Sequence, residues 1–301
     1  MSAIAILCSD IHLSHVAPIA RSAELNWYAA MSRSLNELSK LQSKLGSVPI
    51  ICAGDIFDRW NSPPELVNFA IDRFPRSIAI PGQHDIPNHN MGEIHRSAFW
   101  TLHRSGVLDL GDDNQPYKVS DLITAHLFPW GSEVIPNVDD DGLFHLAVVH
   151  AYVWEGGFGF PGAPEGANLS RWKEKLKGYD AAVFGDNHQG FITKCCDCNV
   201  INCGAFFRRK SDERQYKPMV GILHSDGTIV PYHLDVSADK FIEDDSPSVV
   251  SRDLSDPGVK FMEELGSLGP DSLDFRSAVR RRLDAMGADL ELRAEVEVLL
   301  G

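Results

Sequence analysis

The sequence has neither a long hydrophobic run nor an excess of basic residues. Among its 301 residues, no apolar stretch approaches the length of about 20 that a membrane-spanning helix needs, so we expect no membrane partner. Lysine and arginine together number 28, against 42 aspartates and glutamates, and the formal net charge is −14. This balance argues against a broad basic face that grips nucleic acid unaided. It leaves room for local basic strips or a partner that supplies positive surface.

Two separated Cys-x-x-Cys knuckles are also lacking. Cys8 and Cys52 lie in apolar runs and are expected to be small buried residues. The other four cysteines fall on or near a predicted hairpin, and we favour a Cys-rich hairpin over a zinc site there. These four are Cys195, Cys196, Cys198 and Cys203. The first residues carry neither the basic nor the apolar segment of a signal peptide, so we expect a cytoplasmic, reducing location.

The composition that is present, 44% hydrophobic and 23% charged, is that of a globular chain long enough for one large domain and an appendage. Apolar runs predict three early strands, at residues 3–8, 48–52 and 76–80. Apolar residues at helical spacing predict three helices between and after them, at 23–45, 63–74 and 93–104. This repeated order of strand, loop and helix predicts an α/β sheet with one functional edge.

Polar side chains follow the predicted strands at the points where they end. Loops at the carboxyl edge of an α/β sheet form its crevice, so carboxylates there usually serve chemistry. For Asp55 and Asp58 alone, capping of the next helix is an equally good interpretation. Asp10 and His12 offer an oxygen and a nitrogen ligand, a mixture that suits manganese, iron or zinc. The gathered strand-end residues are Asp10, His12, Asp55, Gln83, His84, His150, Asp186 and His188.

The second half of the chain predicts another sheet, more antiparallel than the first. Its first short alternating segments lie at 107–110, 117–119 and 122–127. Further strands are predicted at 143–149, 179–184, 219–224 and 229–234, with a hairpin formed by 191–194 and 200–202. The long loop 151–169, rich in glycine and proline, is either a substrate wall or a loop whose aromatic rings pack down.

The predicted domain organisation is a main domain at 1–236, a linker at 237–257 and a helical segment at 258–301. The linker is charged and serine-rich. Short amphipathic helices that follow a completed α/β body favour docking of a partner, although they could also pack on their own domain. We therefore expect the last segment to be a docking appendage.

As a set, the strand-end motifs resemble those of the calcineurin-like metallophosphoesterase superfamily. That superfamily has Asp-x-His, Gly-Asp-x-x-Asp, Gly-Asn-His-Asp, a single His and Gly-His-x-His in this order, and the likeness spans residues 3–235. The resemblance implies an α/β fold of two mixed β-sheets packed as a sandwich and flanked by helices. A C-terminal helical appendage would follow the sandwich.

The resemblance also implies a centre of two divalent metal ions, with Mn²⁺ expected and Fe²⁺, Zn²⁺ or Mg²⁺ as alternatives. Its implied ligands are Asp10, His12, Asp55 and His188 for one ion, and Asp55, Gln83, His150 and Asp186 for the other. Gln83 replaces the superfamily's Asn, and Asp186 replaces its first His. Both replacements keep a group able to bind metal, but they bear on the choice of metal and on the strength of the second site.

The same resemblance assigns catalytic roles. His84 would protonate the leaving oxygen or stabilise charge on the phosphoryl group. Asp58 would orient His84 through its ring N–H. Arg59 and the basic run 208–210, with Arg208 first, are candidates to contact phosphate, against the alternative of a solvated surface.

Within the superfamily, the chain looks most similar to the SbcD-type branch, the nuclease subunit of the SbcCD (Mre–Rad) DNA-processing complex. The supporting stretches are 9–13, 81–87, 185–189 and 202–208. This likeness implies a DNA nuclease that hydrolyses phosphodiester bonds. It also implies a coiled-coil ATPase partner of the SbcC/Rad type, bound through the C-terminal helices, and a homodimer.

Two other functions stay open at this point. A stand-alone phosphoesterase that acts on a nucleotide, cyclic nucleotide or phosphoprotein would use the same metal centre. A non-catalytic scaffold with a decayed metal site is the weakest alternative, because every metal position keeps a ligating group. Among histidines outside the motifs, His15 and His89 follow the motif loops most closely and are the best placed to touch a substrate.

Overall fold

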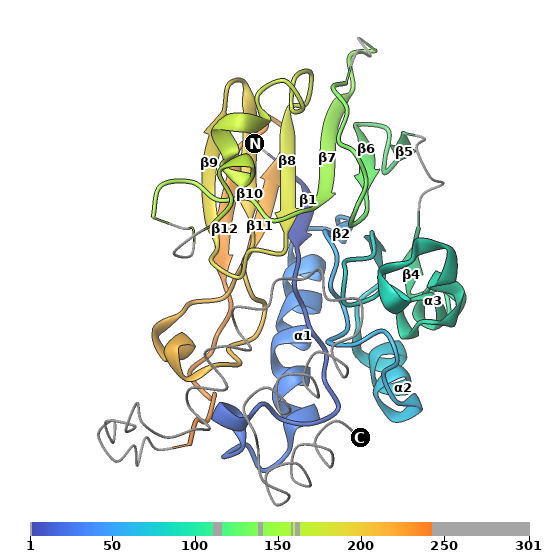
Figure 1. Ribbon diagram of the computed structural model, residues 1–301, viewed down its shortest axis with the longest axis vertical. Helices are drawn as coiled ribbons and strands as arrows, with labels where there is room; N and C mark the ends of the chain where they lie inside the picture. The colour runs from blue at the N-terminus through green and yellow to red at the C-terminus, as the bar shows by residue number, and fades with distance from the viewer. Residues whose placement is uncertain (1, 111–115, 138–140, 158, 160–162, 243–301) are drawn as a thin grey trace, which may run out of the picture. The chain divides into compact units, whose positions relative to one another are not determined.

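The computed structural model describes residues 2–110, 116–137, 141–157, 159 and 163–242 (Figure 1). They belong to the first of two compact units, Met1–Ile242, and the second unit is Glu243–Gly301. The predicted helical segment 258–301 and residues 243–257 of the predicted linker therefore lie outside the described residues. Within the described part, no helix is long and apolar enough to cross a membrane.

The described residues form two mixed sheets of six strands, which confirms the predicted architecture (Figure 1). The first sheet has the order β12-β11-β1-β2-β3-β4, and the second has the order β5-β6-β7-β8-β10-β9. The first sheet contains β1 (Ala3–Cys8), β2 (Ile50–Cys52), β3 (Ser77–Ala79), β4 (Leu108–Asp109), β11 (Met219–His224) and β12 (Ile229–His233). The second contains β5 (Tyr117–Lys118), β6 (Ile123–Phe128), β7 (Phe144–His150), β8 (Ala181–Gly185), β9 (Phe191–Cys195) and β10 (Cys198–Asn202).

Parallel pairing in the first sheet aligns the ends of its central strands. Cys8 at the end of β1 pairs with Cys52 at the end of β2, and Cys52 pairs in turn with Ala79 of β3. The loops after these three strands therefore start at the same level of the sheet. The antiparallel strands β11 and β12 complete the sheet beside β1.

The second sheet differs from its prediction in two ways. Residues 107–110 were expected in it, but β4 pairs in parallel with β3 and is the last strand of the first sheet. The centre of the second sheet, β6-β7-β8-β10, is also parallel, and only β5 and β9 at its edges are antiparallel. Burial on both faces explains why these central strands are almost continuously apolar, without the alternation typical of half-exposed antiparallel strands.

The helices begin and end close to their predictions, with one exception. α1 (Trp27–Lys44) starts after Asn26, whose side chain caps it by accepting from the amide of Ala29. α2 is Pro64–Arg73. The predicted helix 93–104 is two elements, a 3₁₀ helix (Met91–Arg96) and α3 (Ala98–Arg104). Ser97 separates them because its extended backbone stops the first and its hydroxyl caps the second.

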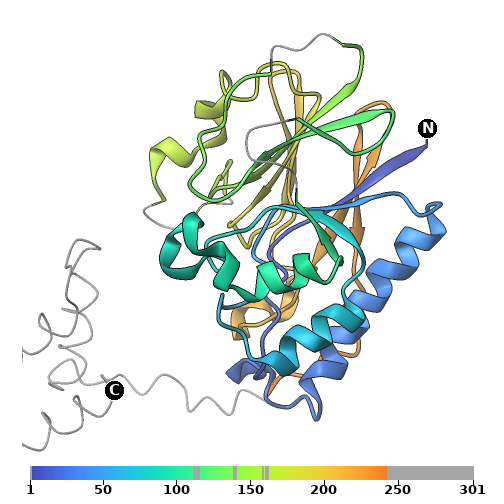
Figure 2. The ribbon, with the colours of Figure 1, turned by 90° about the vertical axis from the view of Figure 1, so that its right-hand side faces the viewer.

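Three clusters of buried side chains join these layers. The first lies between the first sheet and the three α-helices and includes Met31 and Phe99. Figure 2 shows these helices together on one side of the unit. The second cluster joins the two sheets, with Ile51 facing residues such as Val183. The third covers the outer face of the second sheet with the segment that contains Trp172. Both sheets are thus rigid supports for the loops at their ends.

Candidate metal centre

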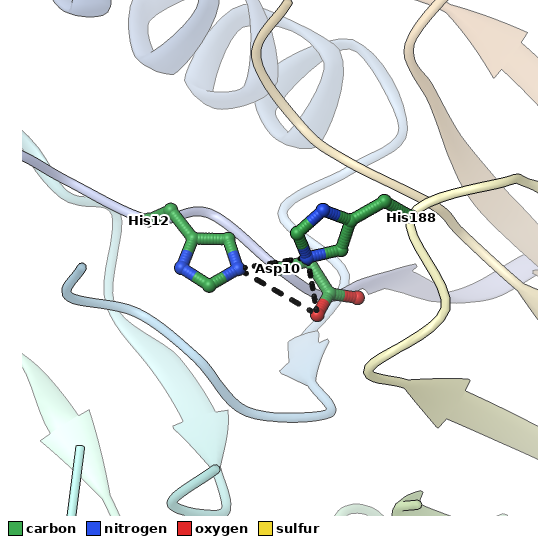
Figure 3. A group of neighbouring side chains, drawn as sticks. All are labelled: Asp10, His12 and His188. Atoms are coloured by element: carbon green, nitrogen blue, oxygen red, sulfur yellow. Dashed lines mark hydrogen bonds and ion pairs between the residues drawn. The ribbon is translucent and has the colours of Figure 1, made fainter. Parts of the chain in front are cut away.

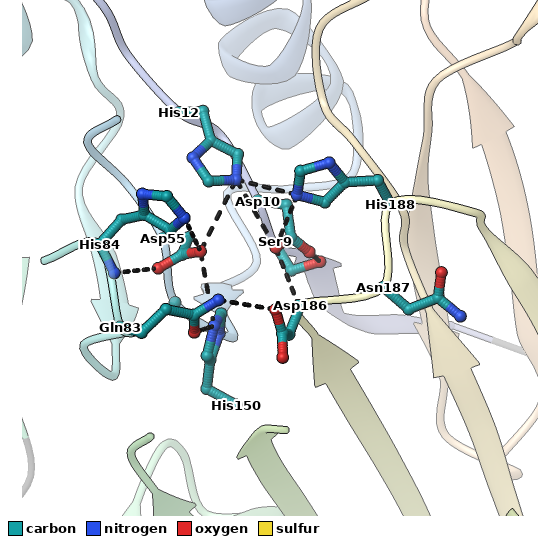
Figure 4. A network of polar contacts seen from close by, with 12 residues as sticks. Ser9, Asp10, His12, Asp55, Gln83, His84, His150, Asp186, Asn187 and His188 are labelled. Atoms are coloured by element: carbon teal, nitrogen blue, oxygen red, sulfur yellow. Dashed lines mark hydrogen bonds and ion pairs between the residues drawn. The ribbon is translucent and has the colours of Figure 1, made fainter. Parts of the chain in front are cut away.

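The candidate metal ligands lie on loops at the carboxyl ends of strands from both sheets (Figure 4). In the first sheet, β1 leads into Asp10 and β2 into Asp55, and the residues after β3 lead to Gln83. In the second sheet, β7 ends in His150 and β8 leads into Asp186. Packing of the two sheets brings these strand ends to one place. The side chains of all seven predicted metal ligands are grouped there: Asp10, His12, Asp55, Gln83, His150, Asp186 and His188.

Two glycines let the loops approach each other. A Cβ atom at Gly82 would lie 2.1 Å from Oδ1 of Asp55, which leaves no room for a side chain. A Cβ atom at Gly54 would lie 2.4 Å from Nδ1 of His150, and the φ of Gly54, +95°, is one that other residues rarely adopt. The glycine before Asp55 is therefore required by the approach of the second sheet.

Four of the candidate ligands have a left-handed backbone. Their φ angles are 51° for Asp10, 49° for His12, 55° for Asp55 and 87° for Asp186. Such conformations cost of order 1–3 kcal/mol each in residues other than glycine and are concentrated at functional sites. Hydrogen bonds between the loops fix them: the amide of Asp10 donates to the carbonyl of Gly54 at 3.0 Å, and that of His12 to Asp55 at 2.9 Å.

The first group of ligand atoms belongs to Asp10, His12 and His188 (Figure 3). The Nε2 atoms of the two histidines lie 3.0 Å apart, and Oδ1 of Asp10 lies 4.0 Å and 3.9 Å from them. Burial lowers the pKa of both His12 and His188, so both imidazoles are neutral and offer a lone pair. Neutral imidazoles beside a carboxylate oxygen are a donor set for a divalent transition metal.

Asp55 lies at the centre of the second set of contacts. Its Oδ2 atom is 3.6 Å from Nε2 of His12, 3.6 Å from Nε2 of His150 and 3.9 Å from Nε2 of His84. This oxygen is fully buried and accepts no hydrogen bond, while Oδ1 accepts one from the amide of His84 at 3.0 Å. A buried carboxylate oxygen without a hydrogen-bond partner is costly unless a cation binds it. The residues present therefore fit divalent ions, with Asp55 between the two halves of the site.

Gln83 connects the remaining two ligands. Its Oε1 atom lies 2.6 Å from Nε2 of His150, and its amide nitrogen donates to Oδ1 of Asp186 at 2.6 Å. Nδ1 of His150 donates to the carbonyl of Ala53 at 2.6 Å, which directs Nε2 into the site. The two departures from the superfamily pattern, Gln83 and Asp186, thus contact each other within the site, and the carboxamide oxygen faces the ring nitrogen of His150.

Burial and neighbouring charge move three pKa values of the site in different directions. Burial raises the pKa of Asp10 to about 7. Burial alone would lower the pKa of His150, but the negative charge of Asp55, whose Oδ2 atom lies 3.6 Å from Nε2 of His150, outweighs it and raises that pKa to about 10. Burial would raise the pKa of Asp55, and the neighbouring His150 brings it down to about 2. Asp55 thus favours a positive charge beside it, for which the His150 proton and a bound cation would compete.

His84 lies beside Asp55 with a partly exposed side chain, and Asp58 orients it in an unexpected way. Nδ1 of His84 donates to the backbone carbonyl of Asp58 at 2.9 Å. The carboxylate of Asp58, which was predicted to orient the ring, instead accepts from Nη2 of Arg209 at 2.6 Å. A carbonyl oxygen orients the imidazole as well as a carboxylate does, without adding a negative charge beside it.

The two predicted phosphate-binding arginines have different surroundings. Arg59 is exposed and lies next to His84, on the wall of a pocket beside the site. Arg208 is buried, and its guanidinium donates to the carbonyls of Val236 and Arg214 and to Asp239, which leaves it turned away from the site. Arg209, its neighbour in the basic run, is the residue that reaches Asp58.

Asp85 and Asn202 hold the loops of the site, and sequence reasoning gave neither a role. The fully buried carboxylate of Asp85 accepts from the amides of Ile56, Phe57 and Gly82, which ties the loop after β2 to the loop after β3. Asn202 donates to the carbonyls of residues 187 and 189 on either side of His188. A carboxylate directly after Gln83 and His84 was the available signal for Asp85, and the stretch 202–208, which is similar to SbcD-type nucleases, was the signal for Asn202.

The other residues considered in the sequence have mixed positions. His15 contacts the hydroxyl of Tyr28 at 2.8 Å and lines a second pocket with Arg59 and Arg209. His89 lines the pocket beside His84. The predicted hairpin is confirmed as β9 and β10, with Cys195 and Cys198 paired across it. Trp154 lies in the loop 151–169, whose residues 158 and 160 are outside the described part of the chain.

The sequence profile of the family described as calcineurin-like phosphoesterase matches residues 5–190, more than half of the chain. The match includes every strand-end motif described above, from Asp10 to His188. The chain therefore belongs to the calcineurin-like phosphoesterase family. No curated protein matches it.

The solved structures that match this chain include an archaeal phosphodiesterase, which is 13% identical with a TM-score of 0.39. That match covers 76% of this chain and 99% of the archaeal one. Another is the sulfate thiohydrolase SoxB of Thermus thermophilus, solved in complex with glycerol, which is 10% identical with a TM-score of 0.46. The match covers 81% of this chain and 59% of SoxB. Likenesses this low in identity say nothing about the substrate of this chain.

Proposed function

We propose that the chain is a phosphodiesterase with two divalent metal ions and that its substrate is DNA. The observation that carries the metal centre is the buried Oδ2 atom of Asp55, which has no hydrogen-bond partner and faces imidazole nitrogens from both sheets. Membership of the calcineurin-like phosphoesterase family supports hydrolysis of a phosphoester. The mixture of carboxylate, carboxamide and imidazole ligands favours Mn²⁺, with Fe²⁺ and Zn²⁺ as close competitors.

Two such ions, when bound, stabilise charge on the phosphate in the transition state and activate water. The residues of the chain orient the other groups. Because the carbonyl of Asp58 only accepts hydrogen bonds, Nδ1 of His84 must carry a proton. The Nε2 atom of His84 then carries a proton only in the imidazolium form, which can donate it to the leaving oxygen. Its side chain is 43% exposed, so a bound phosphodiester can reach it.

The choice of DNA rests on the likeness of four sequence stretches to SbcD-type nucleases and on the cations at the site. Arg59 lies beside His84, and Arg209 reaches the same loop through Asp58. Guanidinium groups at this position can contact the phosphates that flank the scissile bond. The net charge of −14 fits a nuclease whose grip on DNA comes largely from a partner.

We also propose a coiled-coil ATPase of the SbcC/Rad type as that partner, together with a homodimer of this chain. Both proposals come from the SbcD likeness, and the segment expected to bind the ATPase, 258–301, lies outside the described residues. Co-purification of the full chain with the candidate ATPase, compared with a chain that ends after Ile242, tests the role of this segment. Equal recovery of the ATPase with both chains would contradict it.

A stand-alone phosphoesterase for a small nucleotide is the second candidate. It is favoured by the pocket beside His84, whose volume of about 240 Å³ is large enough for a single base. Such an enzyme would cleave small phosphodiesters and leave polymeric DNA intact.

The deciding experiment measures Mn²⁺-dependent cleavage of linear single- and double-stranded DNA beside a small chromogenic phosphodiester, with His84→Ala as the control. DNA cleavage that the control lacks would support the nuclease. Cleavage of the small diester alone, in the presence and absence of the ATPase, would favour the second candidate. If the metal-loaded chain cleaves neither substrate, both candidate enzyme functions are contradicted, and a non-catalytic scaffold is the remaining interpretation.

A further inference from the structure

A pocket opens directly beside His84, the histidine proposed to act in catalysis. His84 and Gln83 form part of its lining, together with Asp58 and Arg59. The rest of the lining does not belong to the metal centre and is here called the aromatic pocket. It consists of Trp60, Asn61, Ile86, Asn88 and His89.

Trp60 forms a fixed wall of the aromatic pocket. Its backbone carbonyl accepts from the amide of Ala98, and the guanidinium of Arg96 lies over its ring at 5.9 Å. Arg96 is in turn paired with Glu93 at 2.7 Å, and the same carboxylate accepts from the side-chain amide of Asn88 at 3.3 Å. The loop after β2 and the loop after β3 are thereby connected around the pocket.

His89 also lines the pocket, in a strained conformation. Asn88 and His89 have φ angles of 52° and 57°, two consecutive left-handed residues that are not glycine. The ring of His89 contacts the ring of Trp130 at a centroid distance of 5.0 Å. His89 and Trp130 also line a neighbouring pocket of about 430 Å³, so an aromatic surface continues away from the metal centre.

The chemistry of the lining selects one class of group. Trp60 and His89 offer aromatic faces, and base stacking on such faces contributes about 1–3 kcal/mol per base. The carboxamides of Asn61 and Asn88 can donate to and accept from the edge of a heterocycle. Arg59 supplies a cation for the attached phosphate, while the only carboxylate of the lining, Asp58, is already paired with Arg209. A planar heterocycle linked to a phosphate matches all of these features.

We propose that the aromatic pocket binds the nucleobase next to the scissile phosphate and that Trp60 and His89 determine specificity for nucleotidic substrates. This inference rests on the proposed phosphodiesterase function. The nucleobase stacks on Trp60 and His89 while its phosphate lies at the metal ions and His84. The site therefore distinguishes a nucleoside phosphodiester from a simple alkyl one.

The test compares two substrates that share a leaving group: the p-nitrophenyl ester of thymidine 5′-phosphate and methyl p-nitrophenyl phosphate. The measured quantity is the ratio of their kcat/KM values, here called the nucleoside preference. We expect a preference of about tenfold or more in the Mn²⁺-loaded full chain, the lower part of the range for base stacking. We expect Trp60→Ala and His89→Ala to abolish most of it and Trp60→Phe to restore part of it.

Matched controls come from the neighbouring helices. His95→Ala and Trp100→Ala replace the same residue types at positions that do not line the pocket, and they should keep the nucleoside preference. His89 is exposed, so its variant stays informative if Trp60→Ala fails to fold. Absence of a preference in the wild-type chain would overturn the inference. Its retention in both pocket variants would do the same.

Calorimetry separates this inference from the proposed function. Binding of thymidine 5′-monophosphate and of methyl phosphate to the Mn²⁺-loaded chain is measured for the same variants, whether or not either ester is hydrolysed. If the nucleotide binds more tightly than methyl phosphate, this difference depends on Trp60 and neither ester is hydrolysed, the base pocket is supported and the phosphodiesterase function is contradicted. Equal affinities of the wild-type chain for the two ligands would contradict the base pocket.

An oligonucleotide distinguishes DNA from a free nucleotide as the source of the base. A short single strand is compared with the same strand made abasic throughout. If DNA is the source, the abasic strand is cut more slowly by the wild-type chain, and Trp60→Ala removes the difference. Cleavage of the nucleoside ester with no cleavage of either strand would assign the pocket to free nucleotides.

Discussion

Asp55 is the residue on which the chemistry of the site depends. It is buried, its Oδ1 atom accepts from the amide of His84, and its Oδ2 atom lies 3.6–3.9 Å from three imidazole nitrogens. The neighbouring His150 lowers the pKa of Asp55 to about 2, and Asp55 in turn raises the pKa of His150 to about 10. Both effects show that this position strongly favours a cation, which is what a bridging metal ligand requires.

We therefore predict that Asp55→Asn loses bound metal. The amide has no negative charge to offset the repulsion between two cations, so affinity should fall by more than the 10- to roughly 100-fold typical of outer-shell changes. The measurement is Mn²⁺ content per chain after dialysis, read by elemental analysis. Asp226→Asn, at an exposed turn, is the control and should keep the wild-type content. Two ions per chain in the Asp55 variant would refute its bridging position.

Asp10 gives a second prediction, which concerns the metal-free chain. Burial raises the pKa of Asp10 from 3.8 to about 7, so between these values the folded chain holds a proton that the unfolded chain releases. The free energy of unfolding should therefore fall as pH rises from 4 to 7, by at most about 4 kcal/mol. Asp10→Asn removes this cost, so the metal-free variant should be more stable than the wild type at pH 8 and nearly equal to it at pH 4.

Chemical denaturation in the presence of a chelator measures this difference at both pH values. The difference between the two chains isolates Asp10, because Asp85, whose pKa burial also raises to about 7, is common to both. A variant that is less stable than the wild type at pH 8 would show that the Asp10 carboxylate supports the metal-free fold. The gain in stability should be accompanied by a loss of metal binding, a trade-off expected at functional sites.

The strand-end residues could be gathered from the sequence because each follows an apolar run, and the resemblance to the superfamily implied which of them would bind metal. Sequence reasoning gave no account of the contacts that depend on the backbone. The carbonyl of Asp58 orients His84, and three amides converge on Asp85, and neither fact is encoded in a side-chain pattern. The burial of Arg208 could not be predicted either, because its partners include the carbonyls of residues 214 and 236, which only the fold brings near it.

At the scale of elements, strand positions could be predicted and strand partners could not. Residues 107–110 alternate like an edge strand of the second sheet, yet β4 pairs with β3 of the first. The sheet that this strand joins depends on where the chain lies after α3, which is set by tertiary packing. The break at Ser97 had a sequence signal in the capping serine, but the apolar spacing across it was interpreted as one helix.

The segment after β12 is attached to the catalytic unit by a cluster of arginines. Arg21, Arg208 and Arg214 surround the ring of Phe241 at 5.0–5.1 Å. Arg21 is 1% exposed and donates to Glu24, and it pairs with Asp239 at 2.8 Å. Residues 237–242, at the start of the predicted linker, are therefore part of the first compact unit.

This attachment predicts a large difference between two arginines that share the same carboxylates. Arg21→Leu leaves the buried Glu24 carboxylate with one partner fewer, so it should lower the free energy of unfolding by about 3 kcal/mol. Arg33 contacts the same two carboxylates, but its side chain is 37% exposed, and Arg33→Leu should cost less than about 1 kcal/mol. Urea denaturation of both variants measures this, and equal costs would mean that burial of the Arg21 network contributes nothing.

At the scale of the whole molecule, the charge of −14 limits how the chain alone can hold DNA. In the described part of the chain, Arg59 lines the pocket beside His84, Arg209 pairs with Asp58, and Lys210 lies near enough to lower the pKa of His188. Each phosphate contact adds about −0.9 to the slope of log affinity against log salt for duplex DNA. Phosphate contacts from these three residues alone therefore predict a slope no steeper than about −3.

Binding of duplex DNA by the full-length His84→Ala chain, measured over a series of salt concentrations, tests this limit. A slope of about −6 or steeper would show that other residues of the chain also contact phosphates, because that value needs at least twice as many contacts as these three residues can supply. Addition of the proposed ATPase partner should make the slope steeper and the affinity higher, since the partner provides the missing positive surface. If the partner leaves both unchanged, the acidic chain must hold DNA through the metal centre and the aromatic pocket alone. Trp60→Ala would then weaken binding at every salt concentration by the same factor, because stacking on an aromatic ring releases no counterions.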